Sequence, residues 1–301
     1  MTRGFCTIAT GSYEYSKLAH NLLLSYRRFS TKKYPFTVIT DKTNELLEQF
    51  DDVIIINDSN RSFLDKLLLF QIIPYDETIF IDADSLAYGD LGKIFEYFED
   101  ADDVSCLGKT LPENSIKGWF RKEDTGVYEE SIEYTIWMHG GIYFIRKTPE
   151  VLSFFDTCVD IANNYKKYFF RFQYLTEPAD EPIVAMAMAI HKFHPIDPKP
   201  EIMAFYRDSK ILRIDMISGK LAYIVESGRT ENGLLVHWAT ANTRKALYKN
   251  EAQKLKILYD KNVFFKSFKL IIIRLKIKYG FMQLTDFKDR IIDYKKRNSV
   301  K

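Results

Sequence analysis

The sequence contains few cysteines. Only three occur in 301 residues, Cys6, Cys106 and Cys158, and each lies among apolar neighbours. An odd and sparse set of this kind is typical of a reducing compartment and argues against a disulfide framework. No two of them form a CxxC pair, so we do not expect a cysteine metal site.

Long uninterrupted apolar runs are also absent. The N-terminus, MTRGFCTIATG, has no charged segment followed by an apolar run, so we expect no signal peptide. The apolar cluster Phe264–Leu275 is interrupted by Lys266, Lys269 and Arg274 and is too short to span a bilayer. Together with the cysteines, these absences predict a cytoplasmic protein.

The chain also lacks a glycine-rich, basic phosphate loop near its N-terminus, which argues against a nucleotidyltransferase. It shows neither an internal repeat nor a low-complexity segment. Hydrophobic residues make up 46% of the chain and charged residues 28%, values typical of a globular protein with a substantial core. Its length allows one large domain or two small ones.

The first hundred residues alternate apolar strands with amphipathic helices. The predicted strands are Phe5–Ala9, Phe36–Ile39, Val53–Ile56 and Ile79–Ile81, and the predicted helices are Tyr15–Arg28, Asn44–Phe50 and Phe63–Ile73. This alternation predicts βαβ units and a mainly parallel sheet. Because ligands bind beyond the carboxyl ends of such strands, the turns at Thr10–Tyr15, Asp41 and Asp82–Asp84 should share one crevice.

The middle of the chain is less regular. Residues 108–135 mix charges, glycines and aromatics without a period, and indicate a long surface loop or subdomain. The other predicted elements are the helices Gly89–Phe98, Pro149–Tyr168 and Glu181–Ile190 and the strands Val104–Leu107, Ile142–Ile145 and Leu234–Val236. We expect residues 1–260 to form one domain.

The most informative stretch is Thr78–Asp90, TIFIDADSLAYGD, in which a buried apolar strand leads directly into Asp82 and Asp84. Two residues apart in an extended chain, the two carboxylates point to the same side. They repel each other unless a cation lies between them. Oxygen ligands suit Mg²⁺ or Mn²⁺, which usually share their coordination with substrate phosphates. The alternative is a solvated Asp-rich turn.

Three further motifs each allow two interpretations. The sequence His139-Gly140-Gly141 could let the backbone pass close to a ligand, or could form an ordinary turn. Asp180-Glu181 could face a developing positive charge on a reacting sugar carbon, or could simply favour the N-terminus of a helix. His237, after an apolar strand, could complete a mixed oxygen and nitrogen metal site, or could be a packed side chain.

Basic residues beside these motifs could meet phosphate charge. Lys66 lies one helix before the aspartates, and Arg244 and Lys245 come shortly after His237. Cationic side chains form strong hydrogen bonds to phosphate oxygens. The alternative for each of them is an exposed helical position.

Taken in this order, the pieces resemble the retaining sugar transferases of glycosyltransferase family 8, which includes glycogenin and bacterial lipopolysaccharide galactosyl- and glucosyltransferases. The resemblance runs from Cys6 to about Lys245 through the segments IATGSYEYSKLA, LDKLLLF, IFIDADSL, HGGIYFIRK, DEPIV and LLVHWATANTRK. It implies a GT-A fold, a Rossmann-like α/β domain with a mainly parallel central sheet and helices on both faces.

The resemblance also implies roles for individual residues. The implied nucleotide-sugar contacts are Thr10, Tyr15 (stacked on uracil), Lys66, Asp82, His139, Gly140, Gly141, Arg244 and Lys245. Asp82, Asp84 and His237 would bind the metal, and Asp180 and Glu181 would act at the reacting carbon. The chain departs from the family pattern at His139 for Asn, Glu181 for Gln, Thr240 for Gly and Thr243 for Lys.

The implied activity is transfer of a hexose from a UDP-sugar to a hydroxyl of a glycan or lipid-linked acceptor, with Mn²⁺ or Mg²⁺ neutralising the charge on the leaving UDP. The departures leave an alternative open. The protein could instead be a catalytically weakened sugar-nucleotide-binding or lectin-like module.

Residues 261–301 differ from the rest in charge. They hold 12 Lys and Arg against 3 Asp and Glu, a net charge of +9, whereas the remaining residues hold 31 against 38, a net charge of −7. The spacing of the apolar residues in this segment predicts a basic helical tail. The tail either lies on the anionic inner face of a membrane or packs on the body of the protein. No recognised nucleic-acid module accompanies the tail, so we expect no nucleic-acid partner.

Overall fold

The computed structural model describes residues 1–57, 59, 63–125, 132–169, 178–225 and 228–259. The chain divides into two compact units, Met1–Ala252 and Gln253–Lys301. Of the second unit the structure describes residues 253–259, the end of helix α7 (Ala246–Tyr259). The predicted basic tail, residues 261–301, lies outside the described residues. Within the described part, no helix is both long and apolar enough to cross a membrane.

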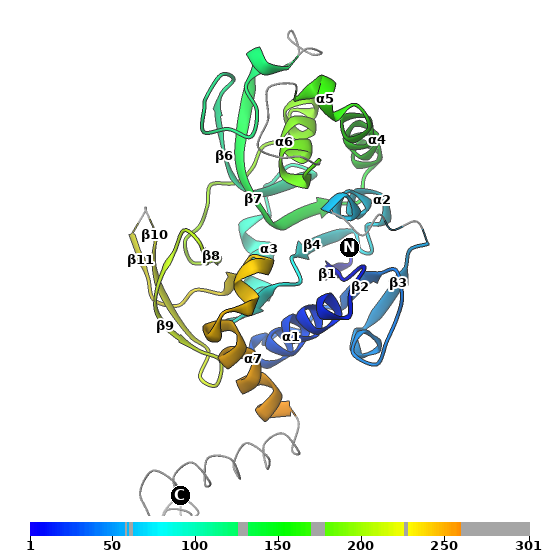
Figure 1. Ribbon diagram of the computed structural model, residues 1–301. Helices are drawn as coiled ribbons and strands as arrows, with labels where there is room; N and C mark the ends of the chain where they lie inside the picture. Colours follow the sequence, from blue (N-terminus) through cyan, green and yellow to red (C-terminus); the bar gives the residue numbers. More distant parts are fainter. Residues whose placement is uncertain (58, 60–62, 126–131, 170–177, 226–227, 260–301) are drawn as a thin grey trace, which may run out of the picture. The chain divides into compact units, whose positions relative to one another are not determined.

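A six-stranded sheet forms the centre of the first unit (Figure 1). Its order is β3-β2-β1-β4-β7-β6, with β1 (Arg3–Ile8), β2 (Phe36–Thr40), β3 (Asp52–Ile55), β4 (Glu77–Ile81), β6 (Val104–Pro112) and β7 (Tyr134–Arg146). Strands β1 to β4 are parallel, and β7 is antiparallel to both of its neighbours. The predicted mainly parallel sheet is therefore confirmed. Because β2 and β3 lie on one side of β1 and β4 lies on the other, the strand order reverses between β1 and β4.

Helices cover both faces of this sheet, as predicted. The helices are α1 (Tyr13–Phe29), α2 (Leu69–Ile72), α3 (Ile94–Tyr97), α4 (Pro149–Asn163), α5 (Tyr165–Tyr168) and α6 (Asp180–His191). Phe5 of β1 packs against Tyr26 of α1 and Phe95 of α3, with ring centroids 5.2 and 5.3 Å away. The next residue, Cys6, points to the opposite face and joins the apolar core formed by α2, α4 and α6.

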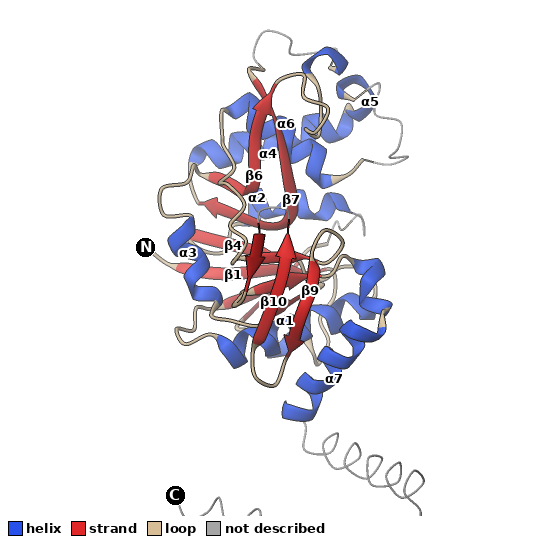
Figure 2. Cartoon of the chain, turned by 90° about the vertical axis from the view of Figure 1, so that its left-hand side faces the viewer, coloured by secondary structure: helices blue, strands red, loops and turns tan. Residues whose placement is uncertain are grey.

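Two three-stranded sheets complete the first unit. One has the order β5-β12-β8, with β5 (Ser85–Ala87), β12 (Leu235–His237) and β8 (Met203–Phe205), and the other is antiparallel, with β11 (Gly228–Thr230), β10 (Lys220–Val225) and β9 (Lys210–Asp215). Figure 2 shows β9 and β10 side by side. In the first of these sheets His237 pairs with Ser85, so residues far apart in the sequence become neighbours.

Short 3₁₀ helices replace parts of three predicted α-helices. They are η1 (Leu47–Gln49), η2 (Phe63–Leu68) and η3 (Leu91–Lys93). Two further 3₁₀ helices are η4 (Lys122–Asp124) and η5 (Thr240–Arg244). The predicted helix Asn44–Phe50 is only η1, and Phe63–Ile73 is η2 followed by α2. The helix predicted over Pro149–Tyr168 is interrupted at Asn164.

The prediction of a loop over residues 108–135 was partly wrong. Strand β6 continues to Pro112 and β7 begins at Tyr134, and these two residues pair directly. Each strand supplies the hydrogen-bonding edge that extends the other, an interaction that local sequence does not reveal. For the same reason His139-Gly140-Gly141 is not a turn but lies inside β7.

Candidate metal centre

Two carboxylates and one imidazole meet at the carboxyl end of β4. Asp82 and Asp84 lie in a turn closed by a hydrogen bond from the Ser85 N–H to the Asp82 carbonyl, at 3.0 Å, so the expected extended chain is corrected to a turn. Nε2 of His237 lies 3.4 Å from Oδ2 of Asp82 and 3.1 Å from Oδ1 of Asp84. The structure thus brings together the three residues implied as metal ligands.

The geometry of this cluster fits a divalent cation. Its three candidate ligand atoms lie within 4.8 Å of one another. Neighbouring ligands of an octahedral Mg²⁺ or Mn²⁺ are about 3 Å apart, close to both histidine–aspartate distances. Oδ1 of Asp84 is buried and faces Nε2 of His237 at 3.1 Å, whereas its Oδ2 accepts a hydrogen bond from Oγ1 of Thr240 at 3.0 Å. A cation would satisfy this buried oxygen, which is otherwise costly to bury.

The pKa shifts reflect close packing of opposite charges. Burial raises the pKa of Asp82, against the opposing charge of Lys66. Burial also acts to raise the pKa of Asp84, but the interaction with His237 outweighs it and lowers that pKa. For His237, burial acts to lower the pKa, and the two aspartates outweigh it and raise the pKa. Both aspartates thus favour a cation at this position, whether the imidazolium proton or a metal ion.

Lys66 connects this cluster to helix α6. Its Nζ lies 2.9 Å from Oδ2 of Asp82, 3.1 Å from Oδ2 of Asp180 and 3.5 Å from the carbonyl oxygen of Gly140. Burial acts to lower the pKa of Lys66, but Asp180 and Asp82 outweigh it and raise that pKa. The side chain therefore stays cationic, and its charge is balanced from both sides.

The two acids of α6 point to β7 and do not cap their helix. The residue before the helix is Ala179, which provides no side-chain cap. Oε1 of Glu181 accepts a hydrogen bond from the Gly140 N–H at 2.9 Å, and Oδ2 of Asp180 accepts one from the Tyr143 hydroxyl at 3.4 Å. Both acids also lie in the first turn of α6, where the helix dipole favours negative charge, so the helix-terminus interpretation holds alongside the contacts with β7.

Gly140 and Gly141 allow these side chains to approach the strand. A Cβ on Gly141 would lie 2.6 Å from Nδ1 of His237, and one on Gly140 would lie 2.9 Å from Cγ of Glu181. The Gly141 carbonyl also accepts a hydrogen bond from the Asp82 N–H at 3.0 Å. The glycine pair therefore serves close approach inside a strand, one of the two interpretations given above.

The turns after β1 and β2 meet beside this cluster, as predicted. The Gly11 N–H donates to Oδ1 of Asp41 at 3.0 Å, and Gly11 has a φ of +84°, which glycine adopts without strain. Oγ1 of the buried Thr10 donates to Oδ2 of Asp65 at 2.7 Å. Because Asp65 precedes Lys66, Thr10 is linked to the metal centre through two adjacent residues.

Three of the predicted nucleotide contacts lie apart from the acids. Tyr15 is exposed near the start of α1, and Arg244 and Lys245 are exposed around the end of η5. Nζ of Lys245 lies 4.9 Å from the ring centroid of Tyr206, whose N–H donates to the His237 carbonyl. Within the described part of the chain, no ion pair joins either basic residue to the aspartates.

Sequence reasoning missed three residues that support the site. Tyr143 contacts Asp180, Asp65 contacts Thr10, and Thr240 contacts Asp84. Thr240 was noted only as a departure from glycine, although its place three residues after His237 is a usable signal. Nothing in the local sequence distinguishes Tyr143 from other core aromatics.

Glu181 should make stability depend on pH. Burial, together with the charge of Asp180, raises the pKa of Glu181 from 4.5 to about 7. Between these two values the unfolded chain releases a proton that the folded protein keeps, so the unfolding free energy falls as the pH rises. We expect Glu181→Gln to remove this fall, because the amide oxygen can still accept from the Gly140 N–H.

Urea unfolding at pH 4.5 and pH 8 measures this effect. The variant should gain stability over the parent chain at pH 8 and not at pH 4.5. Glu133→Gln provides a control of opposite sign, since the hydrogen bond from Lys192 lowers the pKa of the exposed Glu133. A Glu181→Gln effect of the same size at both pH values would contradict the prediction.

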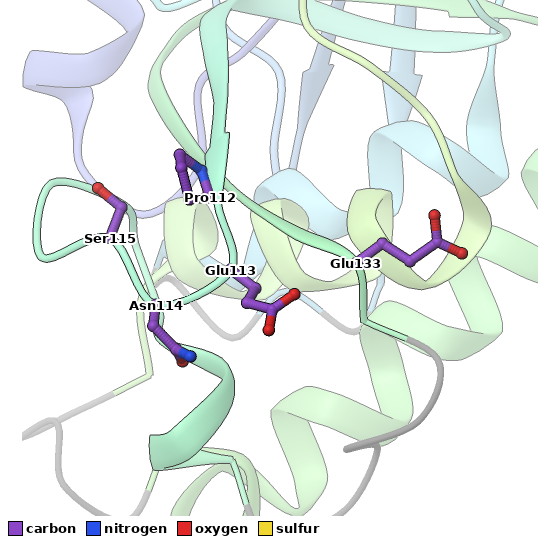
Figure 3. Close-up of a pocket in the computed structure, with 5 residues that line it drawn as sticks. All are labelled: Pro112, Glu113, Asn114, Ser115 and Glu133. Atoms are coloured by element: carbon purple, nitrogen blue, oxygen red, sulfur yellow. The ribbon is translucent and has the colours of Figure 1, made fainter.

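A separate depression lies at the end of the β6–β7 hairpin where the connecting segment begins and ends. Pro112, Glu113, Asn114, Ser115 and Glu133 line it (Figure 3). It lies beside the pair Pro112 and Tyr134, and Gly141 is seven residues further along β7, about 23 Å at the usual rise per residue. With two glutamates and no basic residue among its described lining, it does not suit a diphosphate.

No protein-family model matches the chain, and neither does a curated protein. Similar solved structures include WbbM, a bifunctional glycosyltransferase in its apo form (13% identity, TM-score 0.47, 80% of this chain and 46% of that one). Apo mouse xyloside xylosyltransferase 1 is also similar (11% identity, TM-score 0.47, 80% of this chain and 99% of that one). Apo GlyE, a glycosyltransferase of Streptococcus pneumoniae TIGR4, is another (12% identity, TM-score 0.41, 65% of this chain and 46% of that one). The chain spans about half the length of the WbbM and GlyE chains. Because all three TM-scores lie below 0.5, we argue function from the residues of this chain.

Proposed function

We propose that this chain is a metal-dependent glycosyltransferase with a GT-A fold, which transfers a hexose from a UDP-sugar to a hydroxyl of a glycan or lipid-linked acceptor and retains the anomeric configuration. The observation that carries the proposal is the cluster of Asp82, Asp84 and His237 at the carboxyl end of β4. It lies beside the point where the strand order reverses, which is where open α/β sheets bind their ligands.

The charges of the cluster suit a diphosphate only when a cation is present. Two aspartates alone repel phosphate, whereas Mg²⁺ and Mn²⁺ typically bridge carboxylates and phosphates. A bound Mn²⁺ or Mg²⁺ would stabilise the charge that develops on the departing UDP. Lys66 holds Asp82 in place and adds a fixed positive charge to the same edge of the sheet.

Asp180 and Glu181 are the proposed catalytic residues. In the reaction the acceptor oxygen bonds to the anomeric carbon while the bond from that carbon to the phosphate oxygen breaks. The electron pair leaves with UDP, and the hydroxyl proton passes to the departing phosphate on the same face of the sugar. Asp180, buried and paired with Lys66, supplies negative charge opposite the developing positive carbon. Glu181, with its raised pKa, is suited to orient a hydroxyl.

The nucleotide would lie along the carboxyl ends of β1 and β2. Thr10 and Gly11 lie in the turn after β1, held by Asp65 and Asp41, and the exposed ring of Tyr15 is available to stack on a base. Arg244 and Lys245 are exposed and unpaired with the acids, so their long side chains remain available for phosphate.

A sugar-nucleotide-binding module with little turnover is the second candidate. Glu181 favours it, since this carboxyl stands where the resemblance implies an uncharged glutamine and changes the charge near the reacting carbon.

A cytoplasmic location at the inner membrane face, with residues 261–301 as the attachment, would bring a lipid-linked acceptor within reach. That segment lies outside the described residues.

Binding and hydrolysis of UDP-sugars test the proposal. We expect Mn²⁺ and a UDP-hexose together to raise the melting temperature more than either alone, because only the folded state binds them. We also expect slow, Mn²⁺-dependent release of UDP without an acceptor. GDP-mannose serves as the control donor. Binding without hydrolysis would favour the module, and no stabilisation by any UDP-sugar would refute both candidates.

A further inference from the structure

A row of four aromatic rings leads away from the candidate metal centre. Trp137 and His139 lie two residues apart on β7 and share one face of the strand, with ring centroids 4.7 Å apart. The His139 ring lies 4.5 Å from Phe205 at the end of β8, and Phe205 lies 5.2 Å from His237. The row therefore ends on the imidazole of a candidate metal ligand.

Three rings of this row remain partly exposed. Trp137, His139 and Phe205 are half-buried, and the side chain of His139 is 19% exposed. The alternate residues on the other face of β7, Ile136 and Met138, are fully buried in the core that α4 and α6 cover. Core packing thus explains one face of β7 and not the face that carries the aromatic row.

Polar groups flank the row. Nε2 of His139 lies 3.9 Å from Oδ2 of Asp208, whose side chain is exposed. Burial lowers the pKa of His139 to about 4, so at neutral pH its ring offers one hydrogen-bond donor and one acceptor. Arg207 and Asp208, adjacent and opposite in charge, both influence His139 electrostatically. Mixed charge of this kind suits a neutral polar ligand better than an ion.

We infer that Trp137, His139 and Phe205 form the acceptor subsite, a stacking surface for the pyranose ring of a neutral carbohydrate. This inference rests on the proposed transfer reaction at the neighbouring metal centre. The faces of a pyranose are lined by C–H groups that pack on aromatic rings, and its hydroxyl edge needs polar partners such as Asp208. His139 then contacts the acceptor, in contrast to the donor contact that the family resemblance implies for it.

The distance to the reaction centre supports this assignment. Phe205 packs on His237, and His139 is followed directly by Gly140, which binds Glu181. A sugar stacked on the row therefore lies beside His237, the candidate metal ligand, whereas Glu181 contacts β7 on the opposite face, at Gly140. Trp137, further along the row, would bind the next sugar residue of an oligosaccharide acceptor.

Trp137→Ala tests the inference, with Trp119→Ala as the matched control. Both tryptophans are half-buried and belong to the same region of the chain, but Trp119 packs on the core side and donates from Nε1 to the Met138 carbonyl. The probes are the p-nitrophenyl β-glycosides of glucose and galactose and a panel of neutral and sialylated oligosaccharides. Saturation-transfer NMR measures their binding to the full chain.

We expect Trp137→Ala to weaken binding of the neutral probes about tenfold or more, Trp137→Phe to restore most of it, and Trp119→Ala to change it little. The inference is overturned if no neutral probe binds the parent chain more tightly than Trp137→Ala, or if only sialylated probes do. Absence of UDP release from the parent chain would count against the transferase and leave the probe binding to decide the subsite.

Discussion

Asp84→Ala should abolish the manganese-dependent release of UDP from a UDP-sugar. Asp84 carries a buried carboxylate oxygen, Oδ1, that faces Nε2 of His237 at 3.1 Å. Asp82 is shared with Lys66, so after the substitution only His237 would remain dedicated to the cation. Loss of a group that stabilises developing charge typically costs a factor of about 10² to 10³ in turnover. We expect a loss at the upper end of that range.

The measurement separates metal binding from folding. Mn²⁺ binding, followed by electron paramagnetic resonance, should weaken in parallel with turnover. Asp84→Asn is the second variant, because it keeps the side-chain volume and an oxygen that can accept from Thr240. Asp100→Asn, at an exposed aspartate after α3, should leave both quantities unchanged. Full turnover of Asp84→Ala with Mn²⁺ present would falsify the metal centre.

Gly141→Ala should weaken metal binding nearly as much as removing the histidine. The added Cβ would lie 2.6 Å from Nδ1 of His237, closer than real contacts allow, and 3.1 Å from its Cγ, a tight contact. The imidazole must therefore move, and the position of Nε2 relative to the aspartates changes with it. Misplacing a ligand commonly costs about 10- to 100-fold in metal affinity or activity. Gly141 lies outside the left-handed region, so the effect is steric and not conformational.

A double-mutant cycle identifies the route of this effect. In the His237→Ala background the space that the imidazole filled is free, so adding Gly141→Ala should cost little more Mn²⁺ affinity. Gly140→Ala provides the contrast, because its Cβ meets Glu181 and Tyr143 and not His237. Its effect on turnover should add to that of His237→Ala. If the losses of Mn²⁺ affinity from Gly141→Ala and His237→Ala were additive, Gly141→Ala would act by distorting β7 and not by displacing the imidazole.

The parallel half of the sheet could be predicted because each of its elements carries a local signal. Phe5–Ala9 and Ile79–Ile81 are short apolar runs, and the helix after the first of them has an apolar stripe at helical spacing. Their pairing then follows from general rules of βαβ connection. The same logic placed the turns after β1, β2 and β4 at one edge.

The β6–β7 hairpin could not be predicted in the same way. The part of the hairpin next to the connecting segment contains charged and glycine residues, which usually mark loops. Only the pairing of β6 with β7 keeps this part extended. Gly140 and Gly141 were misleading because glycine in a strand can mark close approach as well as a turn. The reason for this pair lies in Glu181 and His237, which come much later in the sequence.

The candidate site was predictable to different degrees. Asp82 and Asp84 follow a buried strand and could be singled out from local sequence. His237 could be assigned to the site mainly from the family resemblance, since a lone histidine after a strand can have many roles. The contacts of Thr240 with Asp84 and of Tyr143 with Asp180 depend on distances that no spacing rule contains.

The ladder between β5 and β12 has a consequence for the order of events in the cell. It is the pairing of His237 with Ser85 that places the imidazole beside the two aspartates. A nascent chain emerging from the ribosome displays both carboxylates long before the histidine is synthesised. Such contacts between distant residues form late and slowly. The cluster of Asp82, Asp84 and His237 is therefore complete only after β12 has docked. A cation that needs all three ligands would bind to the finished fold and not to an intermediate.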